Sequence, residues 1–561
     1  MTRCGEGNEH VGRRIWVIAA LLVTALAATA CLNQASGSGP RSASGEPTKT
    51  PPPPSDKPNI VFVLTDDLSW NLVKYMSEVR RMRANGTTFT NFYAADSLCC
   101  PSRSNILTGR YPHNTGVRVN ENYRGGGHQA FVRNGNPKRT YTVELDKAGY
   151  RAAHTGKYIN QYNLRKDPVP PGWDEWHIGD GTAYRNIAGS YRMADVQRRG
   201  GPRKITKPSI YLNDQIGKQA RTSANRARDK GKPFFTQLWS YAPHHQYNGK
   251  GSEPKFPAAE RDRPSLGWPG GEFPHGDCGT ARDGSRYDCL DLRVRRGSHF
   301  EESTYQKLDW HYRDRVQMVQ SLNDQMRKMR KQLARNGQLS NTYFVFSSDN
   351  GYHLGEHGLM RGKGSAYDHD TRVPLVVTGP GVEKGAVRRE LTQTVDLYAT
   401  FQELAGLKPK PSDGRSLAPL LHGKKATDWR KGVLFEHRAQ EQNPVTVKDP
   451  DLDGDKASAK RDKFIPAFHS YDAIRTKSWL YVEYSDSKRR ELYDLRSDPA
   501  QNHNVARKHQ RTVQQFSDWL EKYTKCKVDG TSCHEVGRQH PGTKGVQMDK
   551  RARPIKSTNR P

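Results

Sequence analysis

The sequence has 561 residues, too many for one ordinary domain, so a large core with a smaller partner is expected. Only 34% of the residues are hydrophobic, but 10 Trp, 25 Tyr and 16 Phe supply a packed core, which excludes a wholly disordered chain. The 90 basic and 59 acidic residues give a net charge of +31, which favours polyanionic partners or a basic environment. Because no compact basic and aromatic module stands out, nucleic acid is not an expected partner.

The N-terminal 31 residues combine a charged start with a short apolar run. Arg13 and Arg14 precede apolar residues 15–26, and residues 28–31 read ATAC. This pattern is typical of a bacterial export signal and is too short for a typical membrane span. We therefore expect an exported bacterial protein, either fully secreted or held at the cell surface by a lipid on Cys31. Residues 32–57 are rich in Ser, Gly and Pro and predict a flexible linker.

Short apolar runs that end in polar residues recur beyond residue 58. Such continuous runs indicate strands that are buried on both faces. Between two of them, apolar residues from Val319 to Leu333 are spaced three and four apart, as on one face of a helix. The alternation predicts an α/β fold whose large, mostly parallel sheet is flanked by helices. The predicted strands are 60–64, 150–154, 234–239, 344–346 and 375–377.

The alternation weakens around residues 407–413. Beyond this point the pattern predicts a smaller C-terminal α+β domain, in which a short antiparallel sheet is covered by a helix over 511–523. Its predicted strands are 473–475, 479–484 and 491–495. The predicted divisions are an export signal at 1–31, a linker at 32–57, a main domain at 58–408, a C-terminal subdomain at 409–539 and a basic tail at 540–561.

The cysteines divide into pairs. Export makes disulfides possible, and Cys278 with Cys289, as well as Cys526 with Cys533, are close enough in sequence to close short loops. Cys99 and Cys100 are adjacent, so they cannot easily bridge each other. They therefore need another explanation.

Parallel strands bring their carboxyl ends to one edge of the sheet, and ligands of such sheets bind there. Two of the predicted strands end in carboxylate and amide side chains, an all-oxygen set that favours Ca²⁺ or Mg²⁺ over Zn²⁺. The residues expected at this edge are Asp66, Asp67, Lys157, His244, Asp349 and Asn350.

The most specific segment covers residues 99–110 and reads CCPSRSNILTGR. Pro101 suits a first helical position and Gly109 a helix end, so Cys99 is expected just before a short helix. A helix N-terminus presents free N–H groups that can hold a tetrahedral anion. Arg103 could offer its planar fork to the oxygens of the same anion.

This segment resembles the sulfatase motif Cys-x-Pro-Ser-Arg-x-x-x-Leu-Thr-Gly and matches its seven fixed positions. The resemblance extends over roughly 57–525. Residues 99–101 with 156–160 look most like the branch of N-acetylglucosamine-6-sulfatases and heparan sulfatases, whereas 362–364 look more like arylsulfatases. The other matching segments are Asp66-Asp67, Ala242-Pro243-His244, 349–353 and 491–495.

The resemblance implies that a formylglycine-generating enzyme oxidises Cys99 to formylglycine. The hydrated aldehyde carries two hydroxyls: one attacks sulfur and expels the alcohol, giving a covalent sulfate ester. The other hydroxyl then loses its proton as the C=O group reforms and sulfate leaves. The resemblance also implies one Ca²⁺ ion, with Mg²⁺ as an alternative, held by Asp66, Asp67, Cys99, Asp349 and Asn350. It makes 58–408 the catalytic domain.

The resemblance also implies roles for the basic residues. Lys157 and Lys363 would hold the sulfate and leaving-group oxygens, and Arg103 would orient the diol. His244 would protonate the leaving alcohol, with His245 as the neighbouring alternative.

Many sulfatases place a second active-site histidine two residues after the first lysine. Here that position is Ile159, so the role is absent or filled elsewhere, for example by His353.

Three functions fit these features. The first is hydrolysis of sulfate esters on a sulfated sugar or polysaccharide. The second is hydrolysis of phosphate or phosphonate monoesters with the same machinery. The third is a non-catalytic surface protein that binds polyanions and keeps Cys99 as a thiol.

Overall fold

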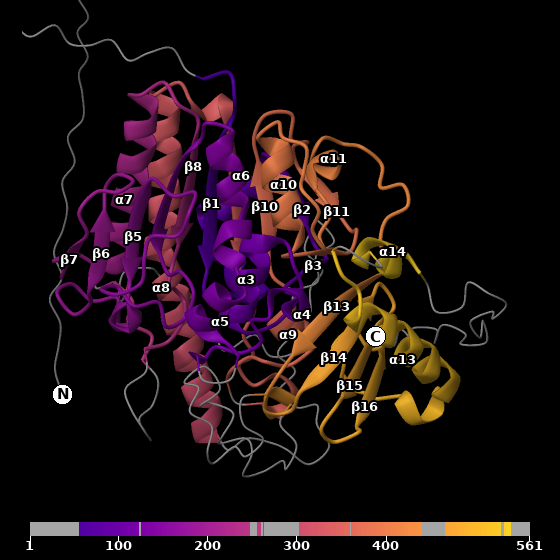
Figure 1. The fold of residues 1–561 in the computed structure, drawn as a ribbon. Coiled ribbons are helices and arrows are strands. Elements are labelled where there is room, and N and C mark those ends of the chain that lie inside the picture. The colour runs from indigo at the N-terminus through magenta and orange to yellow at the C-terminus, as the bar shows by residue number, and fades with distance from the viewer. Residues whose placement is uncertain are drawn as a thin grey trace, which may run out of the picture. The chain divides into compact units, whose positions relative to one another are not determined.

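The computed structural model describes residues 55–122, 125–246, 255–259, 262, 302–359, 361–439, 466–528 and 532–539 (Figure 1). Several predictions lie outside these residues: the export signal with Cys31, most of the linker, the Cys278–Cys289 pair and the basic tail. The proposed divisions of the chain stay predictions.

Ten strands of the described residues form one large sheet in the order β11-β2-β10-β9-β1-β8-β4-β5-β6-β7. The five central strands, from β9 to β5, run parallel. The strands are β1 (Asn59–Thr65), β2 (Thr87–Phe89), β4 (Arg151–Gly156), β5 (Glu175–Gly179), β6 (Met193–Val196), β7 (Lys204–Thr206), β8 (Phe234–Trp239), β9 (Thr342–Ser348), β10 (Leu375–Thr378) and β11 (Ala386–Arg388).

The predicted fold class and the five predicted strands of this sheet are confirmed. One detail differs, because β10 pairs antiparallel with both β9 and β2. Its carboxyl end, at Gly379, therefore lies at the edge opposite to the carboxyl ends of the central strands. An apolar run identifies a buried strand but carries no information on its direction.

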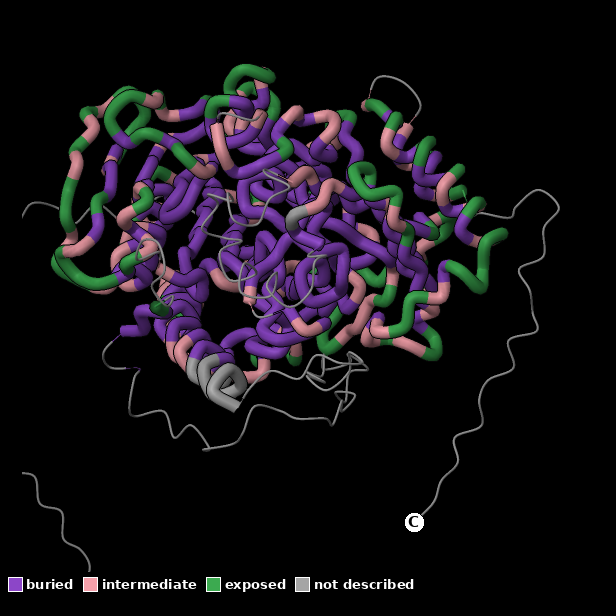
Figure 2. Tube along the Cα trace, turned by 90° about the horizontal axis from the view of Figure 1, so that it is seen from below, coloured by how far each residue is buried: buried purple, intermediate pink, exposed green. Residues whose placement is uncertain are grey.

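Helices cover both faces of the sheet, and β1 shows how the sequence builds the two layers. Ile60, Phe62 and Leu64 pack into one hydrophobic core, whereas Val61 and Val63 pack into the other. All five are fully buried, and Figure 2 shows buried residues filling the centre of the molecule. The first core includes α3 (Cys99–Thr108), α6 (Tyr141–Lys147) and α10 (Asp396–Leu404), and the second includes α2 (Ser77–Ala84), α7 (Leu212–Arg228) and α8 (Glu302–Arg335). The predicted helical face from Val319 to Leu333 lies on α8.

A second, four-stranded antiparallel sheet forms in the C-terminal part, as predicted. Its strands are β13 (Gly432–His437), β14 (Tyr471–Thr476), β15 (Trp479–Tyr484) and β16 (Arg490–Asp494), in that order. The sequence interpretation missed β13. The predicted helix is α13 (Gln510–Thr524), and its Phe516 packs on Tyr481 of the sheet with ring centroids 5.7 Å apart. The remaining elements are α1 (Trp70–Val73), β3 (Phe92–Tyr93), α4 (Pro112–Thr115), α5 (Gly127–Arg133), α9 (Asp368–Thr371), β12 (Thr392–Gln393), α11 (Ala418–Leu421), α14 (Cys533–Arg538) and several 3₁₀ turns.

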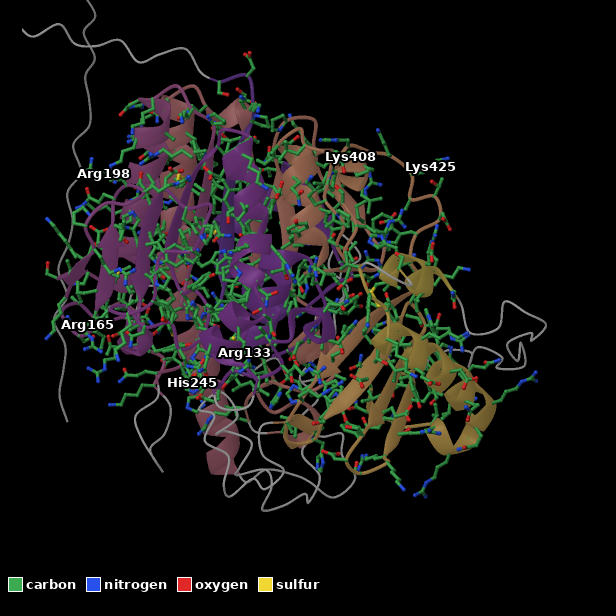
Figure 3. All side chains as sticks on the ribbon, in the orientation of Figure 1. Arg133, Arg165, Arg198, His245, Lys408 and Lys425 are labelled. Carbon is green, nitrogen blue, oxygen red and sulfur yellow. A yellow bond between two sulfur atoms is a disulfide. The ribbon has the colours of Figure 1, made fainter. Side chains whose placement is uncertain are left out.

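Basic side chains lie on several parts of the surface. Figure 3 shows Arg165 and Arg198 at one side of the molecule, and Lys408 and Lys425 at another. All four are exposed. Exposed basic side chains therefore come from distant parts of the chain.

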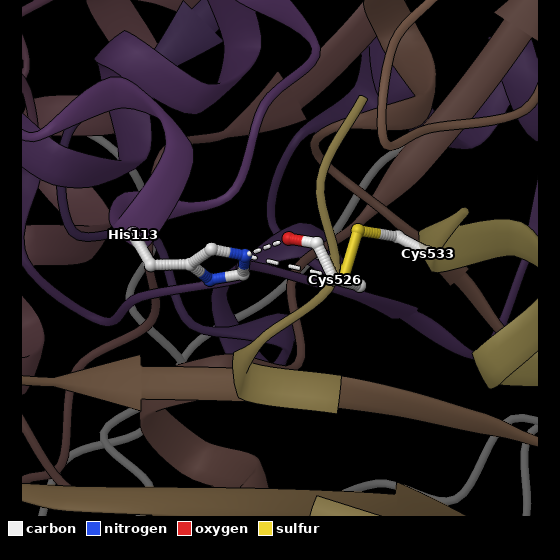
Figure 4. Close-up of side chains that lie close together, drawn as sticks. All are labelled: His113, Cys526 and Cys533. Carbon is white, nitrogen blue, oxygen red and sulfur yellow. Dashed lines mark hydrogen bonds between the residues drawn. A yellow bond between two sulfur atoms is a disulfide. The ribbon is translucent and has the colours of Figure 1, made fainter. Parts of the chain in front are cut away.

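His113 joins α4 to the C-terminal part of the chain (Figure 4). Its Nδ1 lies 2.7 Å from Glu436 Oε2 on β13, and its Nε2 lies 2.8 Å from the carbonyl oxygen of Cys526. Cys526 forms the predicted disulfide with Cys533. Because both sulfurs are in this bond, the cluster offers no thiolate for a metal. Burial lowers the pKa of His113, but Glu436 outweighs it and raises the pKa from 6.5 to about 9.

We expect His113 to make stability depend on pH. A raised pKa means that the protonated ring stabilises the folded state fully below about pH 6.5, and that this contribution is lost as pH rises through about 9. The contribution is about 3 kcal/mol by linkage. The Tm difference between wild type and His113→Gln should therefore be large at pH 6 and small at pH 10. The exposed His503→Gln is the control, and a His113→Gln difference that is constant with pH would contradict the expectation.

Helix α3 begins and ends at specific residues of the motif. It starts at Cys99 itself after the N-cap Leu98, two residues before the predicted first position at Pro101, so the prediction that Cys99 precedes the helix is wrong. Pro101 occupies the third position, where its missing N–H costs nothing because the first four helical N–H groups have no intrahelical acceptor. Gly109 ends the helix as predicted, with a φ of 67°. A Cβ atom at Gly109 would lie 2.6 Å from Tyr398 Cβ.

Gly109→Ala should therefore destabilise the fold through both backbone and packing. Gly135→Ala is a matched control, because Gly135 has a φ of 70° but no heavy atom within 4 Å of the position that a Cβ would take. The backbone cost of a left-handed alanine is about 1 kcal/mol at each site. The overlap with Tyr398 adds about 1–3 kcal/mol at Gly109. Thermal unfolding should show a larger loss for Gly109→Ala, and equal losses would refute the packing contribution.

Candidate active site

Four neighbouring parallel strands, in the order β9-β1-β8-β4, carry the predicted polar residues just beyond their carboxyl ends. Asp349 and Asn350 follow β9, and Asp66 and Asp67 follow β1. His244 lies in the loop after β8, and Lys157 follows β4 directly. The sheet therefore brings together residues that lie up to 284 positions apart in sequence.

Cys99 lies beside the two aspartates. Its Sγ is 3.3 Å from Asp66 Oδ1 and 3.9 Å from Asp67 Oδ1, and all three residues are fully buried. Burial and the negative charge of Asp66 raise the pKa of the Cys99 thiol well above its ordinary value. The thiol is therefore protonated at neutral pH, which makes an unmodified Cys99 a poor nucleophile.

Two lysines compensate the aspartates. Lys157 Nζ lies 2.9 and 2.7 Å from the two carboxylate oxygens of Asp66. Lys363 Nζ lies 2.5 Å from Asp67 Oδ1 and 2.8 Å from Cys99 Sγ. Burial would raise the pKa of Asp66, but Lys157 and the other nearby cations lower it below its ordinary range. The carboxylate of Asp66 is therefore ionised.

Arg103 holds the third carboxylate. Its Nε donates to Asp349 Oδ2 at 2.8 Å, and its Nη1 donates to the carbonyl oxygen of Lys157 at 3.1 Å. Burial raises the pKa of Asp349 to about 6, and the Arg103 guanidinium opposes that rise. Arg103 therefore links the loop after β9 to the loop after β4.

Oxygen atoms suited to a hard cation face this centre. Asp67 Oδ2 and Asn350 Oδ1 are buried and have no hydrogen-bond partner within the described part of the chain. Ligand atoms of Asp66, Asp67, Cys99 and His244 all lie within 4.8 Å of one another. An unpaired buried oxygen is costly unless a cation or donor satisfies it. The residues present therefore fit a divalent metal.

His244 is the histidine that reaches the aspartates. Its Nε2 lies 3.6 Å from Asp67 Oδ2, and its Nδ1 lies 2.7 Å from the carbonyl oxygen of His245. The ring of His245 stacks on that of His244 with centroids 4.6 Å apart, and Figure 3 shows His245 near one edge of the ribbon.

Ile159 lies in the lining of a cavity that also includes Lys157 and His244, whereas His353 contacts Asp370. Ile159 belongs to the hydrophobic core on the α3 face of the sheet. His353 Nδ1 lies 3.0 Å from both oxygens of Asp370, and its backbone pairs with Gly362, next to Lys363. His353 thus supports the lysine loop through its main chain.

Cys100 points into a different environment from Cys99. It belongs to the hydrophobic core, and its backbone N–H donates to Asn120 Oδ1 at 2.9 Å. Burial raises the pKa of its thiol to about 12. Cys100 therefore packs as a small apolar residue.

Sequence reasoning missed His154, which supports Lys157. Its Nε2 lies 3.1 Å from the carbonyl oxygen of Lys157, and its ring packs against Trp176 and Trp239. Burial lowers the pKa of His154 to about 3, so the ring is neutral. No motif marks this residue, because its role depends on the aromatic cage that the fold assembles.

A cavity of about 240 Å³ opens beside Lys157 and His244. Tyr184 and Tyr241 also line it, and the ring of Tyr184 lies 4.5 Å from that of His244. Sequence reasoning missed both tyrosines. Tyr241 is three residues before His244 and could have been noticed, whereas Tyr184 comes from a distant loop.

A family model described as Sulfatase matches residues 58–407, which is more than half of the chain. The chain belongs to the sulfatase family. It is therefore a sulfuric ester hydrolase, as the motif at Cys99 implied.

No helix among the described residues has the length and apolar character needed to cross a membrane.

Known proteins resemble this chain in sequence or in fold. The N-acetylglucosamine-6-sulfatase of Homo sapiens is 29% identical over 470 residues, which cover 80% of this chain and 81% of the human protein. A solved structure in complex with D-glucosamine-2-N,6-O-disulfate, described as its substrate, has a TM-score of 0.63 at 22% identity and covers 84% of this chain and 98% of its own. A phosphonate monoester hydrolase from Silicibacter pomeroyi has a TM-score of 0.60 at 19% identity, with coverages of 85% and 96%. At these identities the two structures show a shared fold.

Proposed function

We propose that this sulfatase removes sulfate from a sulfated sugar or polysaccharide, using formylglycine made from Cys99. The observation that carries the proposal is the buried position of Cys99 between Asp66 and Lys363, at the start of α3. The human relative named N-acetylglucosamine-6-sulfatase and the structure with a glucosamine disulfate support a sulfated sugar as substrate. The net charge of +31 would attract a polyanionic substrate.

The Cys99 sulfur marks the place that the hydrated aldehyde would take. The hydrate supplies a hydroxyl to attack sulfur and a second hydroxyl through which sulfate is released. Lys363 lies 2.8 Å from the Cys99 sulfur and would hold an oxygen at that position. Lys157 and Arg103 both approach Asp66 and would stabilise the negative charge that develops on the sulfate oxygens.

His244 is the proposed general acid. Its ring lines the 240 Å³ cavity, and its Nε2 faces Asp67. A sugar seated in the cavity would have its departing oxygen between His244 and the centre. The half-buried ring of Tyr184 would contact the sugar. Tyr241 would support Tyr184, because its ring packs on that of Tyr184 and its hydroxyl already donates to the carbonyl oxygen of Gly179.

Ca²⁺ is the proposed metal, with Mg²⁺ as the alternative. Asp66, Asp67, Asp349 and Asn350 would supply its oxygen ligands, beside the oxygen that replaces the Cys99 sulfur. When bound, the ion would polarise that oxygen and a sulfate oxygen. The buried Asp67 Oδ2 and Asn350 Oδ1, which have no hydrogen-bond partner among the described residues, support this proposal.

Maturation and export are part of the proposal. Because Cys99 is fully buried, a formylglycine-generating enzyme would have to reach it before the chain folds. Residues 1–31 would direct export, followed by secretion or lipid attachment at Cys31, and 58–408 would form the catalytic domain.

Hydrolysis of phosphate or phosphonate monoesters is the second candidate. The shared fold with a phosphonate monoester hydrolase favours it, and a centre with three buried cations would hold either tetrahedral anion. A non-catalytic polyanion binder would not need this buried centre.

Turnover of matched esters tests the proposal. Nitrophenyl sulfate should be hydrolysed faster than nitrophenyl phosphate and a phenylphosphonate ester, and mass spectrometry of the peptide with residue 99 should show the aldehyde. Cys99→Ala should reduce turnover by at least about 10³-fold, because the nucleophile is lost. Cys100→Ala is the matched control and should stay within a few-fold of wild type. Dominant phosphorus activity, or an intact thiol at residue 99 in active enzyme, would overturn the proposal.

Calcium binding can be measured without turnover. Adding Ca²⁺ to EDTA-treated protein at about 100 times its Kd should stabilise the fold by about 2.7 kcal/mol. For a chain of this size that raises the Tm by about 2–3 °C. Asp67→Asn should abolish most of this shift, whereas Asp324→Asn on α8 should retain it. An equal shift in both variants would place the ion elsewhere.

A further inference from the structure

A larger cavity, of about 580 Å³, lies beside the C-terminal sheet, at the end where β14 turns into β15. Trp429 and Trp479 line it, so we refer to it as the Trp429–Trp479 cavity. It includes the turn between β14 and β15, at Lys477 and Ser478. This cavity has no part in the catalytic centre described above.

The sheet register separates the two sites. Gly432 of β13 pairs with Thr476 beside the cavity, whereas His437 pairs with Tyr471 five residues away. His437 lies next to Gly364, the neighbour of Lys363 in the catalytic centre. Five residues of an extended strand span about 17 Å. The lining of the cavity therefore shares no residue with the catalytic centre.

Positive charge dominates the lining of the cavity. Lys431, Lys477 and Arg496 are exposed, and Glu390 supplies the single carboxylate of the lining. The guanidinium of Arg430 is buried in the wall, where Asp396 neutralises it at 2.5 Å, so the exposed lysines carry the charge offered to a ligand. Among the described residues, neither the Lys431 nor the Lys477 ammonium forms an ion pair. A concave site with this balance of charge favours an anionic ligand.

The two indoles add apolar surface whose orientation is fixed: Trp429 is half-buried, and Trp479 is buried with only 6% of its surface exposed. Trp429 Nε1 donates to the carbonyl oxygen of Leu391 at 2.8 Å, and the Arg415 guanidinium lies 4.6 Å from the ring. The Arg496 guanidinium lies 5.4 Å from the ring of Trp479, while also binding Asp494. Rigid aromatic faces cost little ordering entropy when a ligand binds.

A sugar ring has an apolar C–H face and a polar edge, and a sulfated sugar carries fixed negative charges on that edge. The half-buried indole of Trp429 and the exposed lysines beside it match both features, whereas a simple inorganic anion would use only the cations. We propose that the Trp429–Trp479 cavity is a second binding site, separate from the catalytic centre, for a unit of a sulfated polysaccharide. The site would hold the polymer on the enzyme while another unit is hydrolysed. The proposal takes only its ligand class from the proposed function.

The test measures binding by the full chain with Cys99→Ala, titrated with a heparin hexasaccharide and with its desulfated counterpart. Lys431→Ala/Lys477→Ala should weaken binding of the sulfated hexasaccharide about tenfold, the effect of two exposed charges of up to about 0.7 kcal/mol each. Lys408→Ala/Lys410→Ala removes two exposed lysines elsewhere and should change the Kd by less than about twofold. The desulfated sugar should bind at least about tenfold more weakly than the sulfated one.

Turnover separates this proposal from the catalytic one. With Cys99 intact, Lys431→Ala/Lys477→Ala should leave nitrophenyl sulfate hydrolysis unchanged and raise only the KM for the sulfated polymer. If wild type hydrolyses no sulfate ester, the proposed function fails but the binding result still stands. The cavity assignment is overturned if both double variants lose the same affinity for the sulfated hexasaccharide, or if neither loses any. It is also overturned if the desulfated sugar binds equally well, or if a single-stranded oligonucleotide binds more tightly than the hexasaccharide through the same lysines.

Discussion

The catalytic centre depends on a balance of buried charges. Three buried carboxylates each pair with a buried cation. The pairs are Asp66 with Lys157, Asp67 with Lys363, and Asp349 with Arg103. An isolated charge at any of these positions would be prohibitively costly, so each carboxylate requires its cation and each cation its carboxylate. Removing one partner would disturb the others, because Arg103 and Lys157 both approach Asp66.

The parallel sheet makes this balance possible. Four strands with both faces buried end at the same edge of the sheet. The residues that follow them therefore bring their charged side chains together at a buried position. The supporting contacts run through the main chain: the Lys157 carbonyl oxygen accepts from Arg103 Nη1 and lies 3.1 Å from His154 Nε2. Pre-organised groups of this kind stabilise charge without reorganising during a reaction.

The sequence predicted the features that local pattern encodes. Apolar runs located the central strands, and the seven fixed positions of the motif located Cys99 and Arg103. The direction of β10 was not predictable, because antiparallel pairing is set by neighbouring strands and not by composition. β13 and Tyr184 were missed for a similar reason: each acquires its role only from distant partners, Tyr471–Thr476 for β13 and His244 for Tyr184. The Trp429–Trp479 cavity likewise combines segments that no local sequence pattern connects.

The complete burial of Cys99 has a consequence for any preparation of the protein. On the proposed chemistry, a molecule that folds with its thiol intact has no path back to the modifying enzyme. A purified sample then contains two populations that do not interconvert. One has the aldehyde at residue 99 and is active, the other keeps the thiol and is inactive, and their ratio is set during biosynthesis. Specific activity would report that ratio as much as the rate per site, and two hosts could yield identical folds with very different apparent kcat values.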